Sequence, residues 1–447
     1  MLRSPHDRNI WRIALPALGA LAADPLVSLI DTAFVAWLGP VPLAAMGVDA
    51  ALFSLAFVVF NFLAYGTTPL IADALARGDR RAAGRVVEQA LTLALVIGVV
   101  GSAMLFGLAE PACRAMGATG DVLQPAVDYL RIRALAAPAL LVVTTGHGVF
   151  RGQRDTLTAL WVTLALNAVN LVLDPLLIFG LGWGLTGAAW ATVAAQWTGA
   201  ALFLWLIFGP RREELGVEPR IPAVRELGAL LGVGSVLSLR TFALIGTMTV
   251  ATAVAARLGV AQVAAHQVGI QLWTALALLV DALAVAGQAL VASHLGAGDR
   301  VAAREVGDRL LWLGLWIGGV LAAAMAMAQP LIPRAFDAGP EVGAALRQLL
   351  PIVVLMQPLN ALVFVWDGLF LGLRDYRFVA GAMVASAAPA AILLLLVRPL
   401  GLGLMGVWAA LVLFMVARAA TSAWRWAGAR RRLVQSPDPT DPAPAAG

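Results

Sequence analysis

The sequence predicts an all-α membrane protein of about twelve transmembrane helices, arranged as two related halves of six helices each. Hydrophobic residues make up 61% of the 447 positions and charged residues only 13%. A soluble domain has roughly half apolar and a quarter charged residues. The apolar residues also gather in long runs, and several motifs recur at a nearly constant spacing. These observations together predict the fold class.

The apolar runs are long enough to cross a bilayer. About 20 residues at ~1.5 Å per residue span a hydrocarbon core ~30 Å thick. Backbone groups inside lipid must be paired within the segment, so such runs form helices. The alternating pattern of a membrane barrel is absent. We expect spans near 11–38, 43–75, 86–109, 123–147, 157–180, 187–208, 227–256, 263–293, 306–328, 345–371, 377–397 and 404–426.

The loops predict the orientation, because Arg and Lys collect in short cytoplasmic loops. All 31 basic residues are arginines. With the N-terminus inside, 22 of them lie in cytoplasmic segments and seven in outer ones. We therefore expect a multi-pass protein of the inner cell membrane with both termini cytoplasmic. This distribution of charge reports topology, so we expect lipids around the chain and no nucleic acid partner.

An internal repeat relates the two halves. Gly-Asp-Arg occurs at 78–80 and again at 298–300, an offset of 220, and the motif at 150–155 matches 370–375 at the same offset. A repeat of six spans keeps the same orientation in both copies, as in several secondary transporters. We expect an N-terminal lobe (1–208), a cytoplasmic linker (209–226), a C-terminal lobe (227–426) and a disordered cytoplasmic tail (427–447).

Polar residues within the first half are candidates for an ion site, because a charge at the bilayer centre is costly. Asp24, Ser28 and Asp31 share one face of the first span at i, i+4 and i+7. The fifth span carries a similar face, and the sixth span adds one hydroxyl. These residues are Asn167, Asn170, Asp174 and Thr192.

Two interpretations of this set stay open. The oxygens could hold a proton shared between two acids or a hard cation such as Na⁺. Alternatively, the polar groups could simply bond to one another between helices. The repeat favours function, because Asp31 falls on Ala251 and Asp174 on Leu394 in the second half. If a lobe needed these acids in order to fold, its second copy should keep them.

The second half has a polar set of its own, which includes His266, Asp281 and Asp367. Arg240 could form a neutralising pair with one of the acids, or it could face a substrate. His266 is more typical of a satisfied structural histidine than of a proton carrier. Pro16 lies in the first span and removes one helix hydrogen bond, so it marks either a static kink or a hinge.

Several of these segments resemble the multidrug and toxic compound extrusion (MATE) family in its DinF-like branch. The resemblance rests on "VAAHQVGIQLW" from 263, "LLVDALAVAGQALVASHLGAGD" from 278 and "WDGLFLGLRD" from 366. It implies a two-lobed transporter of twelve helices, of the MATE/MOP type. It also implies an antiporter that exports organic, often cationic, drugs or metabolites in exchange for H⁺ or Na⁺, without a cofactor and not as an enzyme. We expect a monomer.

The resemblance also implies roles for single residues. The essential acid of the family's first helix matches Asp31, and the Asn-x-x-x-Asp of its fifth helix matches Asn170 and Asp174. Thr192 completes the predicted site of ion coupling, and Pro16 matches the proline linked to bending of the first helix. For the substrate cleft we expect Asp24, Ser28, Asn167, Arg240 and Asp367.

Two rival functions remain. A flippase for lipid-linked precursors would need a cluster of cationic residues in the cleft, and Arg240 alone is thin support. A membrane-embedded prenyl transferase would need paired Asp-rich motifs for Mg²⁺ and a diphosphate, and the spans and cytoplasmic loops contain neither Asp-x-x-x-Asp nor Asp-Asp-x-x-Asp.

Overall fold

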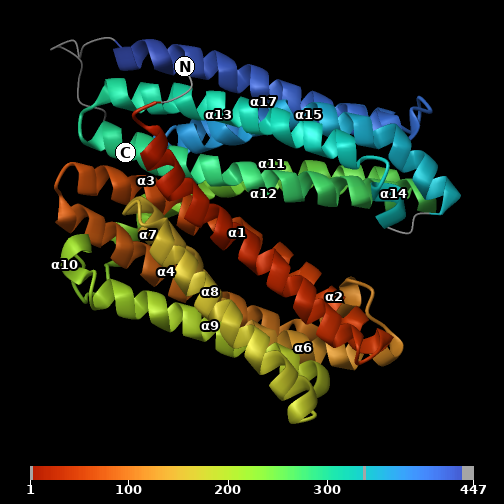
Figure 1. Cartoon of the computed structure of the whole chain (residues 1–447). Coiled ribbons are helices and arrows are strands. Elements are labelled where there is room, and N and C mark those ends of the chain that lie inside the picture. Colours follow the sequence, from red (N-terminus) through yellow and green to blue (C-terminus); the bar gives the residue numbers. More distant parts are fainter. Residues whose placement is uncertain (1–3, 336–338, 435–447) are drawn as a thin grey trace. The chain divides into compact units, whose positions relative to one another are not determined.

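The computed structural model describes residues 4–335 and 339–434, and over these ranges every regular element is helical (Figure 1). Eleven helical segments are long and apolar enough to cross a membrane. The predicted fourth span, 123–147, is helical too but is broken into α6 (Leu123–Ala134) and α7 (Ala137–Gly152). These helices have 12 and 16 residues, so neither crosses a bilayer alone. The predicted all-α membrane fold of about twelve spans is confirmed.

The chain divides into two compact units. The N-terminal unit comprises residues 15–234, and the C-terminal unit comprises 235–447 together with 1–14. The two division points, after residues 14 and 234, are themselves 220 positions apart. Each unit therefore contains the opening turns of the first helix of the other half. The predicted lobe boundaries at 208 and 227 did not anticipate this exchange.

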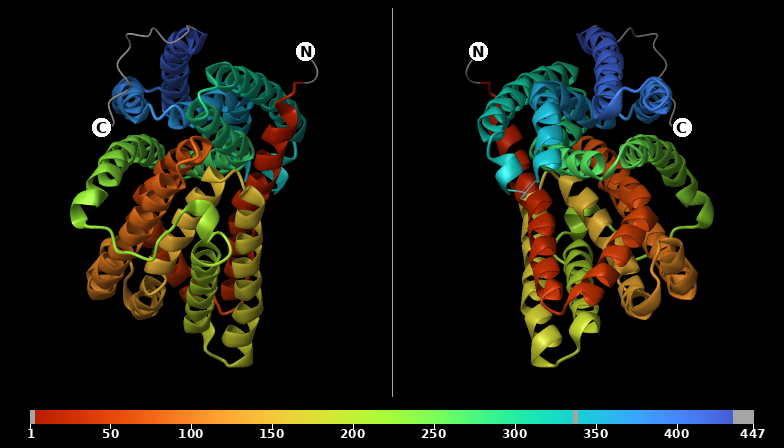
Figure 2. Two further views of the ribbon diagram at one scale, coloured as in Figure 1. Left: turned by 90° about the vertical axis from the view of Figure 1, so that its left-hand side faces the viewer. Right: turned by 90° about the vertical axis from the view of Figure 1, so that its right-hand side faces the viewer.

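The N-terminal unit is a bundle in which α3 and α4 pack on α7, and α8 packs on α9 (Figure 2). Its elements are α1 (Asp7–Ala36) from residue 15 on, α2 (Pro40–Phe57), η1 (Val58–Asn61), α3 (Phe62–Ala76), α4 (Arg80–Gly107), α5 (Ala109–Ala115), η2 (Gly120–Val122), α6, α7, α8 (Thr156–Pro175), the π-helical turn η3 (Leu176–Gly180), α9 (Gly184–Phe208), α10 (Arg212–Leu215), η4 (Val224–Leu227) and the start of α11 (Gly228–Ala256).

The C-terminal unit is centred on α15, which packs on α12, α13 and α17 (Figure 1). Its elements, after the remainder of α11, are α12 (Val260–Gly296), α13 (Arg300–Ala328), α14 (Ile332–Ala335), α15 (Pro340–Gly372), α16 (Tyr376–Leu396) and α17 (Gly403–Val434). Residues 427–434, expected to begin a disordered tail, continue α17. The rest of that predicted tail lies outside the described residues.

The turns confirm the repeat in the backbone itself. Arg154 and Arg374, at matching positions, are the non-glycine residues with positive φ in the described chain, at 61° and 58°. Left-handed backbone is costly for a residue with a Cβ, so the same turn has been kept in both halves against that cost. The aspartates at 79 and 299 each accept a hydrogen bond of 2.9 Å from the backbone N–H three residues later, and so cap α4 and α13 alike.

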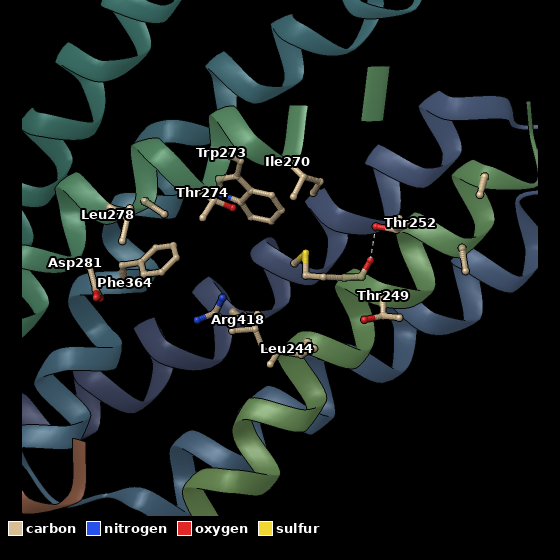
Figure 3. A pocket seen from close by; sticks show the side chains of 15 residues that line it. Leu244, Thr249, Thr252, Ile270, Trp273, Thr274, Leu278, Asp281, Phe364 and Arg418 are labelled. Atoms are coloured by element: carbon tan, nitrogen blue, oxygen red, sulfur yellow. Dashed lines mark hydrogen bonds between the residues drawn. The ribbon is translucent and has the colours of Figure 1, made fainter. Parts of the chain in front are cut away.

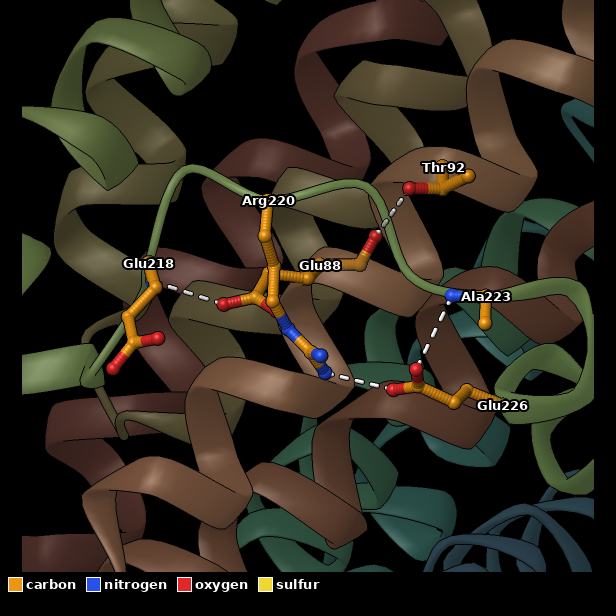
Figure 4. Close-up of polar contacts among 6 residues, drawn as sticks. All are labelled: Glu88, Thr92, Glu218, Arg220, Ala223 and Glu226. Atoms are coloured by element: carbon orange, nitrogen blue, oxygen red, sulfur yellow. Dashed lines mark hydrogen bonds and ion pairs between the residues drawn. The ribbon is translucent and has the colours of Figure 1, made fainter.

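The linker between the halves is fastened to α4 (Figure 4). The buried carboxylate of Glu88 accepts hydrogen bonds from the backbone N–H of Glu218 (2.9 Å) and from Nε of Arg220 (2.8 Å). Arg220 also donates to Glu226 at 2.7 Å. The hydrogen bond to Glu88, and after it the one to Glu226, raises the pKa of Arg220 above its usual value. The segment 209–226 is thus held against its own unit.

Candidate functional site

The first cluster of polar residues lies in the N-terminal unit, where α8 presents one buried polar face. Asn167, Asn170 and Asp174 are 7%, 5% and 1% exposed. Their i, i+3, i+7 spacing places them on one side of the helix. Asp155 caps this helix by accepting a hydrogen bond from the backbone N–H of Thr158 at 3.1 Å, which fixes where the helix begins.

The structure brings this face to the acids of α1, as the sequence predicted. Nδ2 of Asn167 donates to Oδ1 of Asp24 at 2.9 Å, and Nδ2 of Asn170 donates to Oδ2 of Asp174 at 2.8 Å. The side chains of Asp31 and Asp174 lie close enough to affect each other electrostatically. Two carboxylates that lie so close repel each other, and a proton bound between them removes that repulsion.

This pair of acids has spare binding capacity. Oδ1 of Asp31 and Oδ1 of Asp174 are both buried and have no hydrogen-bond partner within the described chain. A buried polar atom without a partner carries a desolvation cost. A site that binds a proton or a small cation from outside would remove that cost.

The hydrogen bonds of Thr192 and Ser28 do not connect these residues to the cluster. The hydroxyl of Thr192 donates to the carbonyl of Ala188, one turn back in α9, at 3.1 Å. Ser28 is exposed, and its carbonyl accepts from the hydroxyl of Thr32 at 2.7 Å. Their predicted roles stay predictions.

A second acid and a guanidinium lie beside this cluster, and the sequence interpretation missed both. Nε of Arg133 in α6 donates to Oδ2 of Asp49 in α2 at 3.3 Å, and Asp49 is 2% exposed. The guanidinium lies 4.7 Å from the ring centroid of Phe53 and interacts electrostatically with Asp31. Asp49 was detectable as an acid within an apolar span, whereas Arg133 was counted only among the seven outer arginines, although it lies within the predicted span 123–147.

The C-terminal unit holds a different arrangement, a carboxylate between two guanidinium groups. Oδ2 of Asp367 in α15 accepts from Nη2 of Arg240 in α11 at 2.5 Å and from Nη2 of Arg418 in α17 at 2.7 Å. Asp367 is 9% and Arg418 4% exposed. The neutralising pair considered for Arg240 is therefore present, and its partner is Asp367. Arg418 was recognised only as an arginine within a span, with no partner.

Arg418 also forms part of the wall of a cavity of about 720 Å³ between α11, α12, α15 and α17 (Figure 3). The wall is mostly apolar and includes the side chains of Met248, Trp273 and Phe364, with a second charged group at Asp281. Pockets for organic ligands have this size and this mixture of apolar walls with a few polar groups. Of the residues expected in a substrate cleft, Arg240 and Asp367 are connected to this cavity through Arg418.

Two features bear on cofactors and on the predicted hinge. Within the described residues, no group of three or more His, Cys, Asp or Glu side chains is placed to hold a metal ion. Pro16 and Pro25 both lie inside α1, which continues unbroken from Asp7 to Ala36. The role of Pro16 as a hinge stays a prediction.

Comparisons with known proteins identify the family. A MatE family profile matches residues 16–176 and again 237–397, one match to each half. The chain is 38% identical to Protein DETOXIFICATION 44, chloroplastic, of Arabidopsis thaliana, over 93% of this chain and 81% of that protein. It is 29% identical to DNA damage-inducible protein F of Escherichia coli (strain K12), over 94% and 92%.

The fold is also similar to solved structures. The structure titled "Crystal structure of MATE in the bent conformation" superposes with a TM-score of 0.88 at 22% identity, covering 97% of this chain and 98% of that one. Three findings agree on the family: the family profile matches twice, one relative is more than one third identical along the chain, and the fold is similar to that of a solved MATE structure. The chain belongs to the MATE family of multidrug and toxic compound efflux transporters.

Proposed function

We propose that this transporter is an antiporter that exports amphipathic organic compounds in exchange for protons, and that the proton binds between Asp31 and Asp174. Transporters of this family are ion-coupled and hold no prosthetic group. The observation that carries the proposal is that these two neighbouring carboxyl groups each keep one buried oxygen with no hydrogen-bond partner in the described chain, so that a proton can bind between them. Na⁺ is the competing coupling ion.

The coupling needs a ligand that binds one conformation better than the other. When the acid pair is deprotonated it carries two negative charges, which favour a bound organic cation. When a proton enters from the outside, one charge is removed and the attraction for that cation falls. The proton and the substrate therefore exclude each other electrostatically, and a proton gradient can drive export.

The cavity beside Arg418, within the C-terminal unit, offers a separate surface for organic substrates. Trp273 and Phe364 supply aromatic surface there, and Met248 supplies a flexible apolar side chain that adapts to different shapes. We propose small organic substrates, a monomer within lipid, an inner-membrane location and cytoplasmic termini. The flippase alternative is less well supported, because Arg240 and Arg418 are both bonded to Asp367.

The test is efflux of a cationic dye from proteoliposomes, with a proton gradient and a Na⁺ gradient imposed separately. We expect efflux by the wild type under the proton gradient only. Asp31→Asn and Asp174→Asn should lose it, while Asp121→Asn, a change in an exposed outer acid, should keep it. Efflux by the wild type driven by Na⁺ alone would reassign the ion, and full activity in both mutants would show that the acids are structural.

A further inference from the structure

The first helix of the chain belongs to both units. Residues up to Ala14 pack with the C-terminal unit, and residues from Leu15 on pack with the N-terminal unit. The helix itself is continuous from Asp7 to Ala36, and Pro16 lies two positions beyond the division. Asp24 and Asp31, farther along the same helix, contact α8 in the N-terminal unit. One helix thus physically joins the C-terminal unit to the acid pair.

The start of this helix is fixed to α13 by a two-pronged ion pair. Nε of Arg309 donates to Oδ1 of Asp7 at 2.7 Å, and Nη2 of Arg309 donates to Oδ2 of the same carboxylate at 2.8 Å. The side chains are 11% and 22% exposed. The guanidinium also lies 4.4 Å from the ring centroid of Trp312. Such parallel bonds fix direction as well as distance.

Neighbouring contacts strengthen this attachment. The backbone N–H of Ser4 donates to Oδ2 of Asp7 at 2.9 Å, which ties the preceding turn to the same carboxylate. Nε2 of His6 lies 3.1 Å from Oε2 of Glu305, also on α13. Two consecutive residues at the start of α1 therefore contact the same helix of the C-terminal unit.

We propose that the Asp7–Arg309 pair is a permanent anchor that positions Asp31: it holds the first turns of α1 to α13, so that movement of the C-terminal unit is transmitted along α1 to the acid pair. This inference rests on the proposed function. Asp7 and Asp31 are separated by on the order of 36 Å of helix, enough for a small rotation at the anchor to displace a carboxyl group. Asp7 and Arg309 are positioning residues, since they act through α1.

The first test measures the anchor itself, without transport. A spin label at the exposed position 8, in a Cys113→Ala background, reports the mobility of the first turns by electron paramagnetic resonance. We expect an immobile spectrum in the parent and a mobile one after Asp7→Asn or Arg309→Gln. The exchanged pair Asp7→Arg with Arg309→Asp should return most of the immobile signal. An unchanged spectrum in both single variants would overturn the anchor, whether or not the protein transports.

The second test asks whether the anchor couples transport. Asp7→Asn and Arg309→Gln should lower proton-driven efflux about tenfold while the Kd for the dye stays within about twofold, because the binding groups are intact. The matched control is Asp375→Asn, which breaks an equally short ion pair with Arg425 (2.7 Å) that does not involve α1. Equal loss of efflux in this control and in Asp7→Asn would overturn a specific role.

A cross-link distinguishes a permanent anchor from a latch that opens in each cycle. Cysteines at positions 7 and 309, again with Cys113→Ala, would be joined by a thiol-reactive linker about as long as the ion pair it replaces. We expect low efflux before joining and recovery after it. Loss of the remaining efflux on joining would show that the contact must open, and would overturn the proposal. Failure of the unmutated protein in the proton gradient would instead contradict the proposed function, and the spin-label test would still decide the anchor.

Discussion

The two units have the same turns and different chemistry. Arg154 and Arg374 adopt the same left-handed conformation, yet the acids Asp31, Asp174 and Asp367 have no acidic counterpart at the matching position of the repeat. Asp31 and Asp174 correspond to Ala251 and Leu394, and Asp367 corresponds to His147. In the N-terminal unit, Asp31 and Asp174 each keep one buried carboxyl oxygen without a partner in the described chain, whereas Asp367 in the C-terminal unit is paired with two guanidinium groups. The two units therefore share the backbone turns of the fold, whereas their buried charged side chains differ.

The difference between the two units is tested most directly by removing one acid from each of them. Asp174→Asn keeps the shape of the side chain and its contact with Asn170, but it cannot share a proton with Asp31. We expect proton-driven efflux to fall on the order of a hundredfold or more, in line with the loss of a proton-transfer group. The protein should still fold, so its Tm should stay close to that of the wild type. Retained coupling would move the ion site elsewhere.

The corresponding change in the C-terminal unit should act on stability. Asp367→Asn leaves Arg240 and Arg418 facing each other without a compensating charge. Removing one member of a buried ion network costs about 3 to 5 kcal/mol. We expect a markedly lower Tm, measured from intrinsic tryptophan fluorescence in detergent. Replacing both arginines by Met in the same background should recover part of the loss, and no recovery would show that the charge balance is not the cause.

The cavity gives a smaller, more selective effect. Phe364→Ala should weaken dye binding about tenfold, because an aromatic side chain contributes roughly 1.5 to 3 kcal/mol of buried apolar contact. Proton binding at the acid pair should be unaffected when no dye is present, since Asp31, Asp174 and their partners are unchanged. Equilibrium binding measured by dye fluorescence polarisation checks the first expectation. Trp316→Ala, at a position 60% exposed on α13, is the control.

The smallest expected effect concerns two ion pairs, one at the linker that follows the first half and one near the end of α17. Glu88 holds the linker through Arg220, and its repeat counterpart Asp308 holds the end of α17 through Arg430 at 2.9 Å. Because these partners are largely accessible to water, each pair contributes little. Glu88→Gln and Asp308→Asn should each lower Tm by about 2 °C, leaving efflux unchanged. A loss of efflux in Glu88→Gln would show that the linker takes part in the transport cycle.

Much of the fold followed from hydropathy alone, because an apolar run of about 20 residues has few alternatives to a membrane helix. The break between α6 and α7 was not predicted, although Pro138 in the first turn of α7 is a signal for a helix start at this point. Helical spacing selected Asp31, Asn170 and Asp174 as candidates for one site. The partners of Asp49 and Asp367 could not be predicted, because they lie on other helices and depend on how those helices pack.

The exchange of opening turns between the halves has a consequence for assembly. The first turns of α1 lie in the C-terminal unit, and those of α11, where Leu230 and Val233 are close to Gly66, lie in the N-terminal unit. Each half thus contributes the first turns of one helix to the bundle of the other half, as the subunits of a domain-swapped dimer do, but here within one polypeptide. Neither half can complete its bundle with its own residues, so two half-length chains, cut within the linker, should find each other in the membrane and reassemble.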